Sequence, residues 1–372
     1  MEVKANYKES LTNLACSIRK YFDLKYSHNT LDYIDREFAA YQPKNVVTLL
    51  CDGMGSNIMD RLLDTNSFLI QHRVKPISSV FPPTTVAATT SMITGLNPCE
   101  TGMLGWHSYY KDLDKVITTY RHSDKNDPSH RVLPEAIEYR KKHMNEQSIA
   151  SEINHAGIYQ GYEIYPFGED PYRSIDDMFY RIYERCNCDG KKYVYAYDEN
   201  PDSTMHLMGC DDKTVQSIMK SLDHRIEQLS NQLTDTMLFV VADHGHINVE
   251  NIFLDDYPDI LDCLSRTTSI ESRAVNFFIK PDKKDEFVEK FHMYFGQDFD
   301  LYPMEEVIES HLFGDGEENP IFHDLLGDYL AIAKTNKTLT FKDQHAFKSN
   351  HAGNTEDELL VPLVLVKTRK SF

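Results

Sequence analysis

The sequence predicts an α/β fold with a mainly parallel central sheet that is flanked by helices. Short, fully apolar runs of strand length alternate with amphipathic segments of helical spacing. The apolar runs carry hydrophobic side chains on both of their faces, which is typical of parallel strands buried on both sides. No repeat or low-complexity tract interrupts this alternation.

The predicted elements follow one another from the first apolar run to the last. We expect strands over Val46–Leu50, Lys192–Tyr197, Met237–Ala242, Ala274–Ile279, Tyr329–Lys334 and Leu360–Val366. We expect helices from the end of the first strand to Leu63, over Asp212–Leu233 and over Lys283–Phe295, where apolar residues recur every three or four positions. This alternation of strands and helices favours an α/β architecture over an all-β or an all-α one.

The composition changes in one long stretch, residues 249–348, which contains four prolines and an acidic turn. We predict a main α/β domain formed by residues 1–248 and 349–372, with 249–348 as a smaller inserted α+β region. A continuation of the central sheet is the alternative. Residues 97–130 form a second excursion between predicted elements, and loops of this length are often functional.

Charge and composition exclude several classes of protein. The chain has 39 basic and 58 acidic residues, a net charge of −19, so we expect no nucleic-acid polymer as a partner. No apolar run approaches the roughly 18 residues of a membrane span, and the first 25 residues contain no apolar signal-peptide core. Together with seven scattered cysteines, these features predict a cytoplasmic protein without a membrane partner. They leave the oligomeric state open.

Charged side chains follow the ends of three predicted strands and precede the last one. In open α/β sheets, ligands bind beyond the carboxyl ends of the strands. Each residue alone could be an ordinary turn or helix-cap residue. As a set they offer carboxylate oxygens and imidazole nitrogens, which suit zinc or a similar transition ion, and six ligands fit two ions better than one. The set is Asp52, Asp202, His206, Asp243, His244 and His351.

A candidate nucleophile lies in the segment Val80–Gly95. Two consecutive prolines, at 82 and 83, force extended backbone and then a helix start, so Thr84 or Thr85 is expected at the helix N-cap. The N-terminus of a helix attracts anions, and a hydroxyl bound to a metal there loses its proton more easily. A threonine-rich capping segment without chemistry is the alternative interpretation.

The order of these motifs resembles the alkaline phosphatase superfamily, and within it the type I phosphodiesterase/nucleotide pyrophosphatase family. The resemblance frames nearly the whole chain but matches no motif between residues 250 and 345. It implies an alkaline-phosphatase-like fold and two divalent ions, with zinc preferred over manganese or iron. By position, it implies one ion held by Asp202, His206 and His351, a second held by Asp52, Asp243 and His244, and Thr85 as a ligand of the second ion and as the nucleophile.

One departure from the family concerns the phosphate pocket. Diesterases of the family often carry an asparagine three residues after the nucleophile, where this chain has Ala88. We expect a substitute donor from the 97–130 excursion, because losing such a donor costs about 2.7–4 kcal/mol. The candidates for substrate binding are Trp106, His107, Tyr109 and Tyr110. The departure weakens the expectation of nucleotide pyrophosphatase activity in particular.

The predicted function is therefore two-metal hydrolysis of a small-molecule phosphate ester through a phosphothreonine intermediate on Thr85. No arginine lies inside the matched motifs, which favours phosphodiesters over the more highly charged monoesters. Three alternatives stay open: a phosphomutase or a carbon–phosphorus hydrolase on the same scaffold, and a metal-binding homologue without turnover.

Overall fold

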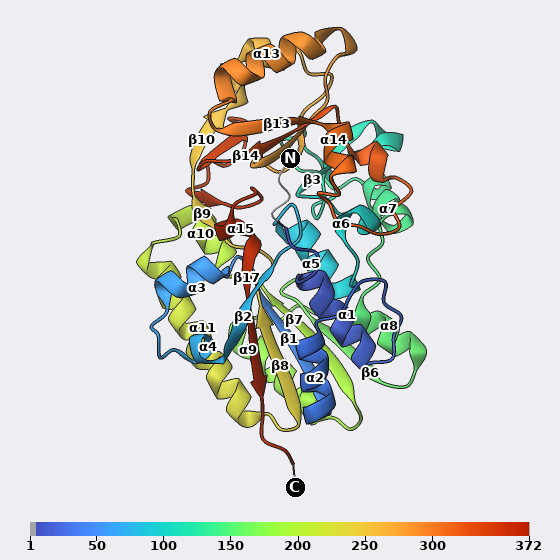
Figure 1. Ribbon diagram of the computed structural model, residues 1–372, viewed down its shortest axis with the longest axis vertical. Coiled ribbons are helices and arrows are strands. Elements are labelled where there is room, and N and C mark those ends of the chain that lie inside the picture. Colours follow the sequence, from blue (N-terminus) through green and yellow to red (C-terminus); the bar gives the residue numbers. More distant parts are fainter. Residues whose placement is uncertain (1–4, 372) are drawn as a thin grey trace.

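The computed structural model describes residues 5–371 and contains two sheets, stacked end to end along the long axis of the molecule (Figure 1). The first sheet has six strands and the second has seven. Two short two-stranded ribbons lie beside them, formed by β9 (Ile247–Asn248) with β16 (Ser349–Asn350) and β10 (Glu250–Phe253) with β15 (Lys337–Thr340). No helix among residues 5–371 is long and apolar enough to span a bilayer.

The six-stranded sheet confirms the predicted α/β class. Its order is β2 (Arg73–Ser78), β17 (Leu360–Lys367), β8 (Thr236–Val241), β1 (Asn45–Cys51), β7 (Lys192–Asp198) and β6 (Gln160–Ile164). The four strands β8, β1, β7 and β6 are parallel. β17 runs antiparallel to β8, and the edge strand β2 pairs antiparallel with β17, so it has the direction of the other four. Every residue of β1, β7 and β8 is buried, as the continuous apolar runs predict.

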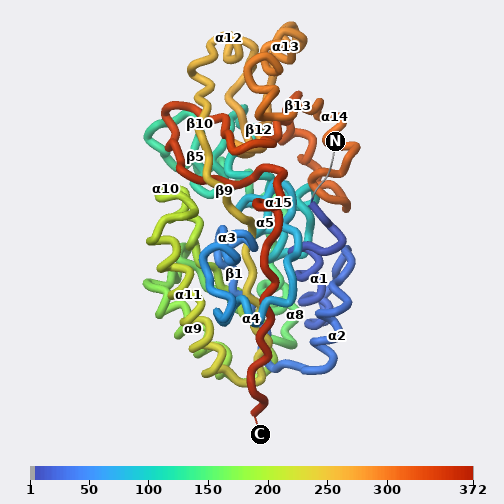
Figure 2. Tube along the Cα trace, turned by 60° about the vertical axis from the view of Figure 1, so that its left-hand side comes forward, coloured from blue at the N-terminus to red at the C-terminus, as the bar shows by residue number. Residues whose placement is uncertain are grey.

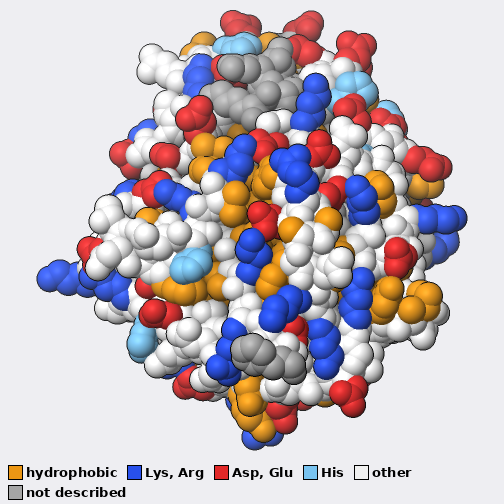
Figure 3. Space-filling model, turned by 60° about the horizontal axis from the view of Figure 1, so that its bottom comes forward, with side chains coloured by type: hydrophobic (Ala, Val, Ile, Leu, Met, Phe, Trp, Pro, Cys, Tyr) orange, Lys and Arg blue, Asp and Glu red, His pale blue; other side chains and the backbone are white. Residues whose placement is uncertain are grey.

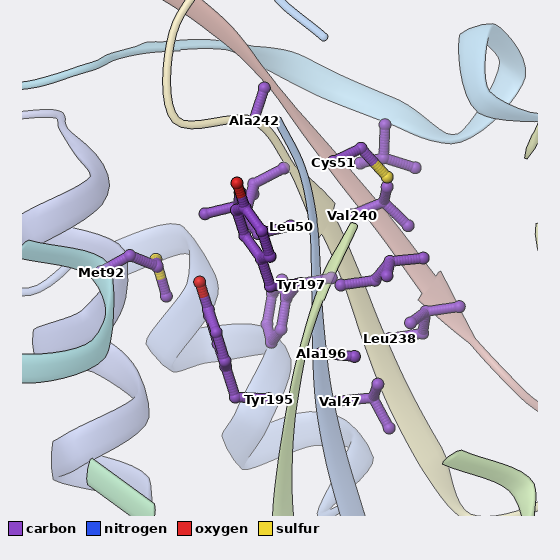
Figure 4. Close-up of a cluster of buried hydrophobic side chains, with 14 of the residues drawn as sticks. Val47, Leu50, Cys51, Met92, Tyr195, Ala196, Tyr197, Leu238, Val240 and Ala242 are labelled. Atoms are coloured by element: carbon purple, nitrogen blue, oxygen red, sulfur yellow. The ribbon is translucent and has the colours of Figure 1, made fainter. Parts of the chain in front are cut away.

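Helices cover both faces of this sheet (Figure 2). One layer contains α1 (Leu11–Tyr21), α2 (Asp32–Tyr41), α5 (Thr85–Thr94) and α8 (Ile149–Ala156). The other contains α3 (Ser56–Leu62), α4 (Phe68–His72), α9 (Ile175–Asn187) and α11 (Lys213–Gln232). Figure 4 shows the packing between sheet and helix: Tyr195 and Tyr197 project from β7 toward Met92 of α5, while Val240 and Leu238 of β8 project to the other face.

The second sheet is antiparallel throughout and draws its strands from two separate parts of the chain. Its order is β13 (Phe299–Pro303), β14 (Tyr329–Ala333), β12 (Ala274–Phe277), β11 (Ser269–Ile270), β3 (His107–Tyr110), β4 (Lys115–Thr118) and β5 (Ser123–Asp124). The excursion at 97–130 thus pairs with the stretch at 249–348 through β3 and β11. The predicted domain boundaries at 248 and 349 stay a prediction.

Short helices surround the second sheet, and α13 (Lys284–Phe295) covers one of its faces at the far end of the molecule (Figure 1). Phe287, Phe291 and Phe295 recur every four residues along α13 and are fully buried in the core beneath it. The remaining helices of this region are α6 (Pro98–Thr101), α7 (Pro134–His143), α12 (Pro258–Leu261) and α14 (Met304–Glu309).

The acidic residues lie partly on the surface and partly in the interior. Figure 3 views the molecule from the end that carries the C-terminus, where Lys and Arg side chains are interspersed with acidic and apolar ones. The carboxylates in the interior include those of Asp52, Asp202 and Asp243, each no more than 9% exposed. Their common burial directs attention to the junction between the two sheets.

Candidate metal centre

The three buried aspartates meet because β1, β7 and β8 are parallel neighbours that end at the same edge of the sheet. Backbone hydrogen bonds continue past the strand ends: Asp52 N donates to Asp198 O at 2.9 Å, and Asp202 N donates to Asp52 O at 3.0 Å. Gly53 N donates to Asp243 Oδ1 at 3.0 Å. Main-chain hydrogen bonds therefore hold together the loops after β1 and β7, and the Asp243 side chain ties in the loop after β8.

Gly53 is required for this close approach. Its φ of +71° lies in the left-handed region that favours glycine. A Cβ atom at this position would stand 2.9 Å from Cβ of Asp202, closer than real Cβ contacts allow. A side chain at residue 53 would therefore separate Asp52 from Asp202.

The structure brings all six predicted ligands together in two adjoining groups. Asp202 and His206 lie on α10 (Asp202–Met208), Asp52 and Asp243 follow β1 and β8, and His351 follows β16. The first group contains Asp202, His206, His246 and His351, and the second contains Asp52, Asp243 and His244, with the ligand atoms of each group within 4.8 Å of one another. Their division matches the one that the resemblance implies, with His246 added. The role of each residue as a ligand stays a prediction.

Three of the histidines are oriented by backbone carbonyls. The Nδ1 atoms of His206, His244 and His351 lie 2.9, 3.0 and 3.2 Å from the carbonyl oxygens of Ser349, Gly245 and Pro83, respectively. An Nδ1–H that donates to a carbonyl leaves the lone pair of Nε2 free to bind a metal. This is the tautomer that a metal ligand needs.

The charges at the centre are unbalanced. Burial raises the pKa of Asp52, and the neighbouring Asp202 carboxylate raises it further. Burial and the Asp52 carboxylate raise the pKa of Asp243 well above its usual value. Burial opposes protonation of His244, but Asp243 and Asp52 raise its pKa to about 10. Carboxylates packed this closely disfavour their own ionisation unless cations lie between them.

Orphaned oxygen atoms also fit a metal. Asp52 Oδ1 and Asp243 Oδ2 are buried and accept no hydrogen bond from any residue in the range 5–371. Buried carboxylate oxygens normally have a partner, and a coordinated cation is one way to supply it. The donor set of three carboxylates and three or four imidazoles is the one that zinc and similar transition ions prefer. The residues therefore fit two divalent ions.

Thr85 is the first residue of α5 and lies beside the second group. Its Oγ1 atom is 3.3 Å from Asp52 Oδ2 and 3.3 Å from His244 Nε2. Thr84 is the N-cap, as one of the two predicted registers has it, and its Oγ1 donates instead to Glu271 Oε1 at 2.6 Å. The hydroxyl of Thr85 therefore lies where the N-terminus of α5 and the second group meet.

At the other end of α5, Arg19 of α1 donates to Thr94 O at 2.8 Å.

The predicted substrate-binding residues occupy different environments. Trp106 and His107 are partly exposed, and the Trp106 ring packs edge-on against Tyr120. Tyr109 is mostly buried, and its hydroxyl donates to Asp114. Tyr110 is fully buried in the second core, where its ring stacks on that of Tyr139. Ile117 and Leu330 belong to the same apolar cluster. Tyr110 therefore has a packing role in the second core. Contacts from Trp106 and His107 to a substrate stay predictions.

Ala88, at the position of the family asparagine, is fully buried in the main core. The next residue, Thr89, donates to the Thr85 carbonyl at 2.6 Å and lies 3.2 Å from the Tyr120 hydroxyl. Tyr120 follows β4 and belongs to the 97–130 excursion, from which we expect a substitute donor. Its hydroxyl therefore contacts α5 at a residue one turn after Thr85, the predicted nucleophile.

Sequence reasoning missed three residues of the site. Tyr197, near the end of β7, donates its hydroxyl to Asp52 Oδ2. His246 contacts Asp202, and its signal was available, because it stands three residues after Asp243 in the same loop. Glu271 comes from the second sheet region and accepts hydrogen bonds from Thr84 and from the backbone of Trp106. No motif marks Glu271, and only the tertiary structure places it here.

A buried ion pair supports the loops that carry the histidines. Arg273 and Glu358 are both 0% exposed and form two hydrogen bonds, of 2.6 and 3.0 Å. Glu358 lies on α15 (Glu356–Leu359), where its carboxylate accepts from Gly353 N at 2.7 Å and its carbonyl from Gly245 N at 2.8 Å. Although burial raises the pKa of Glu358, Arg273 holds it below its usual value. The pair thus links the second sheet to the loops at His244 and His351.

We expect Arg273→Ala to lower the free energy of unfolding by about 3–5 kcal/mol, because it leaves Glu358 buried without its counter-charge. Denaturation of the metal-free protein by guanidinium chloride measures this change. Lys334→Ala is the control, since Lys334 pairs with Asp300 on the surface and its loss is expected to cost about 1 kcal/mol or less. Equal midpoints for the two variants would show that the buried pair does not support the fold.

Most of the chain matches the sequence pattern of a known family. The family model described as "Type I phosphodiesterase / nucleotide pyrophosphatase" matches residues 46–356, which include every residue of the two ligand groups. The chain belongs to this family. It is accordingly a metal-dependent phosphoric ester hydrolase with an alkaline-phosphatase-like fold.

Solved structures show the same fold. An inactive variant of murine ectonucleotide pyrophosphatase/phosphodiesterase 5 in complex with AMP is 20% identical and has a TM-score of 0.67, with 88% of this chain and 91% of that chain covered. The human ectonucleotide pyrophosphatase/phosphodiesterase 5 is 16% identical, with the same TM-score and coverage. A search of curated proteins finds no match in sequence. At these identities the likeness concerns the fold alone.

Proposed function

We propose that this family member hydrolyses small phosphodiesters with two divalent ions, preferably zinc, through a phosphothreonine intermediate on Thr85. The observation that carries the proposal is the position of Thr85 Oγ1, which lies 3.3 Å from both Asp52 and His244 at the N-terminus of α5. A nucleophile in this position is next to ligands of the second ion and in the positive potential of the helix end.

In the proposed reaction, the side chains of the two groups have separate roles. Asp202, His206 and His351 would hold the first ion, and Asp52, Asp243 and His244 the second. When bound, the ions neutralise the buried carboxylates and stabilise negative charge on the phosphate oxygens. Backbone N–H groups at the start of α5 orient the phosphate, so that the Thr85 hydroxyl faces phosphorus.

Two displacements complete the proposed cycle. Thr85 Oγ1 attacks phosphorus, so that an Oγ–P bond forms while the P–O bond to the leaving alcohol breaks. The proton of the threonine hydroxyl ends on that alcohol. Water then attacks the phosphothreonine, the Oγ–P bond breaks, a phosphomonoester leaves, and Thr85 regains a proton from the water. Atoms and charge balance in both steps, with one water consumed for each diester.

Glu271 supports the preference for diesters. Its Oε1 accepts from Thr84 Oγ1 at 2.6 Å and from Trp106 N at 2.8 Å, which places a carboxylate beside the residue that precedes the nucleophile. A phosphomonoester carries one more negative charge than a diester, so a nearby carboxylate repels it more strongly. The charge of Glu271 therefore disfavours monoesters at this end of the site.

The test compares hydrolysis of bis-p-nitrophenyl phosphate and p-nitrophenyl phosphate by the zinc-loaded protein. We expect kcat/KM to be at least about tenfold higher for the diester, a difference of about 1.4 kcal/mol in activation free energy. A nucleoside 5′-phosphodiester is a suitable further probe, because one structurally similar protein is known in complex with AMP.

Glu271→Gln is the matched variant, because it removes the charge but keeps an acceptor for Thr84 and Trp106. We expect it to narrow the ratio of diester to monoester kcat/KM, mainly through faster monoester hydrolysis. A monoester preference in the unmodified protein would contradict the proposal. Two bound ions without turnover of either ester would favour a phosphomutase or a carbon–phosphorus hydrolase instead.

A further inference from the structure

His246 lies at the first ligand group, but the predicted set of ligands does not include it. It is 0% exposed, and its Nε2 atom is 2.7 Å from Asp202 Oδ1. The centroid of its ring lies 4.7 Å from the ring centroid of His206 and 5.3 Å from that of His351. His246 is therefore either a fourth ligand of the first ion or a partner of the Asp202 carboxylate.

Interatomic distances favour the second role. Two donor atoms bound to one tetrahedral zinc lie about 3.3 Å apart, since each bond is about 2.0–2.1 Å long. His206 Nε2 and Asp202 Oδ2 are separated by this distance, 3.3 Å. The 2.7 Å between His246 Nε2 and Asp202 Oδ1 is shorter and is the length of a hydrogen bond from N–H to a carboxylate.

The second ring nitrogen supports the same conclusion. A metal-bound histidine almost always donates its other N–H, as the Nδ1 atoms of His206 and His351 can to backbone carbonyls. The buried Nδ1 of His246 has no hydrogen-bond partner in the described part of the chain. If Nε2 bound a metal, Nδ1 would carry a buried proton without an acceptor. If the proton is on Nε2, Nδ1 has nothing to donate.

We infer that His246 is a positioning residue whose Nε2–H donates to Asp202 Oδ1. The hydrogen bond orients the Asp202 carboxylate so that Oδ2 is left for the first ion beside His206 Nε2, at 3.3 Å, while His351 Nε2 lies 3.8 Å from Oδ1. The ion then has three protein ligands and keeps an open coordination position, as catalytic zinc sites do. This inference rests on the proposed use of metal ions by the centre.

The test measures zinc affinity by competition with a chromophoric chelator in the unmodified protein, His246→Ala and His246→Gln. We expect His246→Ala to weaken binding of one of two ions by about 10–100-fold, the usual effect of losing a partner of a metal ligand. His246→Gln should restore the affinity to within about threefold, because its amide N–H can replace Nε2–H, whereas an amide is not among the usual zinc ligands.

Cobalt substitution provides a second readout, because the visible spectrum of Co²⁺ depends on its ligands. We expect the same spectrum for the unmodified protein and His246→Gln. If His246→Gln had a shifted spectrum and bound zinc as weakly as His246→Ala, the inference would be overturned and His246 would be a ligand. If His246→Ala bound zinc as tightly as the unmodified protein, His246 would have no role in metal binding. Two ions bound by the unmodified protein would leave the proposed function standing in both cases. Absence of zinc binding there would overturn the metal centre and this inference together.

Discussion

Thr85→Ala is expected to lower kcat for diester hydrolysis by at least about 10⁴-fold, the scale of loss when a catalytic nucleophile is removed. The reason is that Thr85 Oγ1 is the hydroxyl placed between Asp52 and His244 at the start of α5. Both ions should stay bound, because Asp52, Asp243 and His244 remain to hold the second one. Initial rates and metal content of the purified variant measure the two effects.

Thr84→Ala is the matched control, with the same chemical change one residue earlier. Thr84 Oγ1 contacts Glu271 rather than the ligand groups, so this variant should lose about 1 kcal/mol of stability and keep most of its turnover. Acid quenching during turnover should trap on the unmodified protein a phosphoryl group that is still esterified to the second alcohol, and none on Thr85→Ala. Equal loss of activity in the two variants would refute Thr85 as the nucleophile.

Removal of the metal ions is expected to abolish hydrolysis and to destabilise the protein. Asp52, Asp202 and Asp243 are buried together, and without metal ions the neighbouring histidines offset only part of their mutual repulsion. Zinc at 100 times its dissociation constant should stabilise the native state by about 2.7 kcal/mol for each site. Thermal unfolding after dialysis against a chelator, with and without added zinc, measures the change.

Asp243→Ala distinguishes the two sites in this experiment. It removes a ligand of the second group only, so we expect zinc to give one increment of stabilisation instead of two. Magnesium should not replace zinc at the first group, because magnesium prefers oxygen ligands and two of the three proposed ligands there, His206 and His351, offer nitrogen. A melting temperature that is independent of chelator and zinc would contradict the two-ion centre.

The central sheet could be predicted from the sequence because its strands are continuous apolar runs. The structure confirms strands at the runs that begin at Val46, Lys192 and Met237, and a helix close to the predicted 212–233. The second sheet was only partly predicted. Its strands β3, β4 and β5 are two to four residues long, and β3 is joined to β11 by pairing across more than 150 residues, which no local pattern reports.

The candidate site divides in the same way. Asp52, Asp202 and Asp243 could be predicted because each follows a strand or begins the helix after it, and parallel strands end at one edge of the sheet. Glu271 and Arg273 could not, because they belong to a different sheet and reach the site through contacts with Thr84 and Glu358. His246 was visible in its loop, but its role depends on a distance to Asp202 that spacing does not give.

The sequence by itself determined the fold class, the family and the order of residues that can bind metals and carry a nucleophile. These properties are local, since they depend on the periodicity of apolar residues and on short motifs at strand ends. Only the tertiary structure decided which imidazoles share one group, which hydroxyl faces Asp52, and which carboxylate of the second sheet region contacts Thr84. Such choices depend on distances between side chains far apart in the chain, and packing of the two sheets against each other sets those distances.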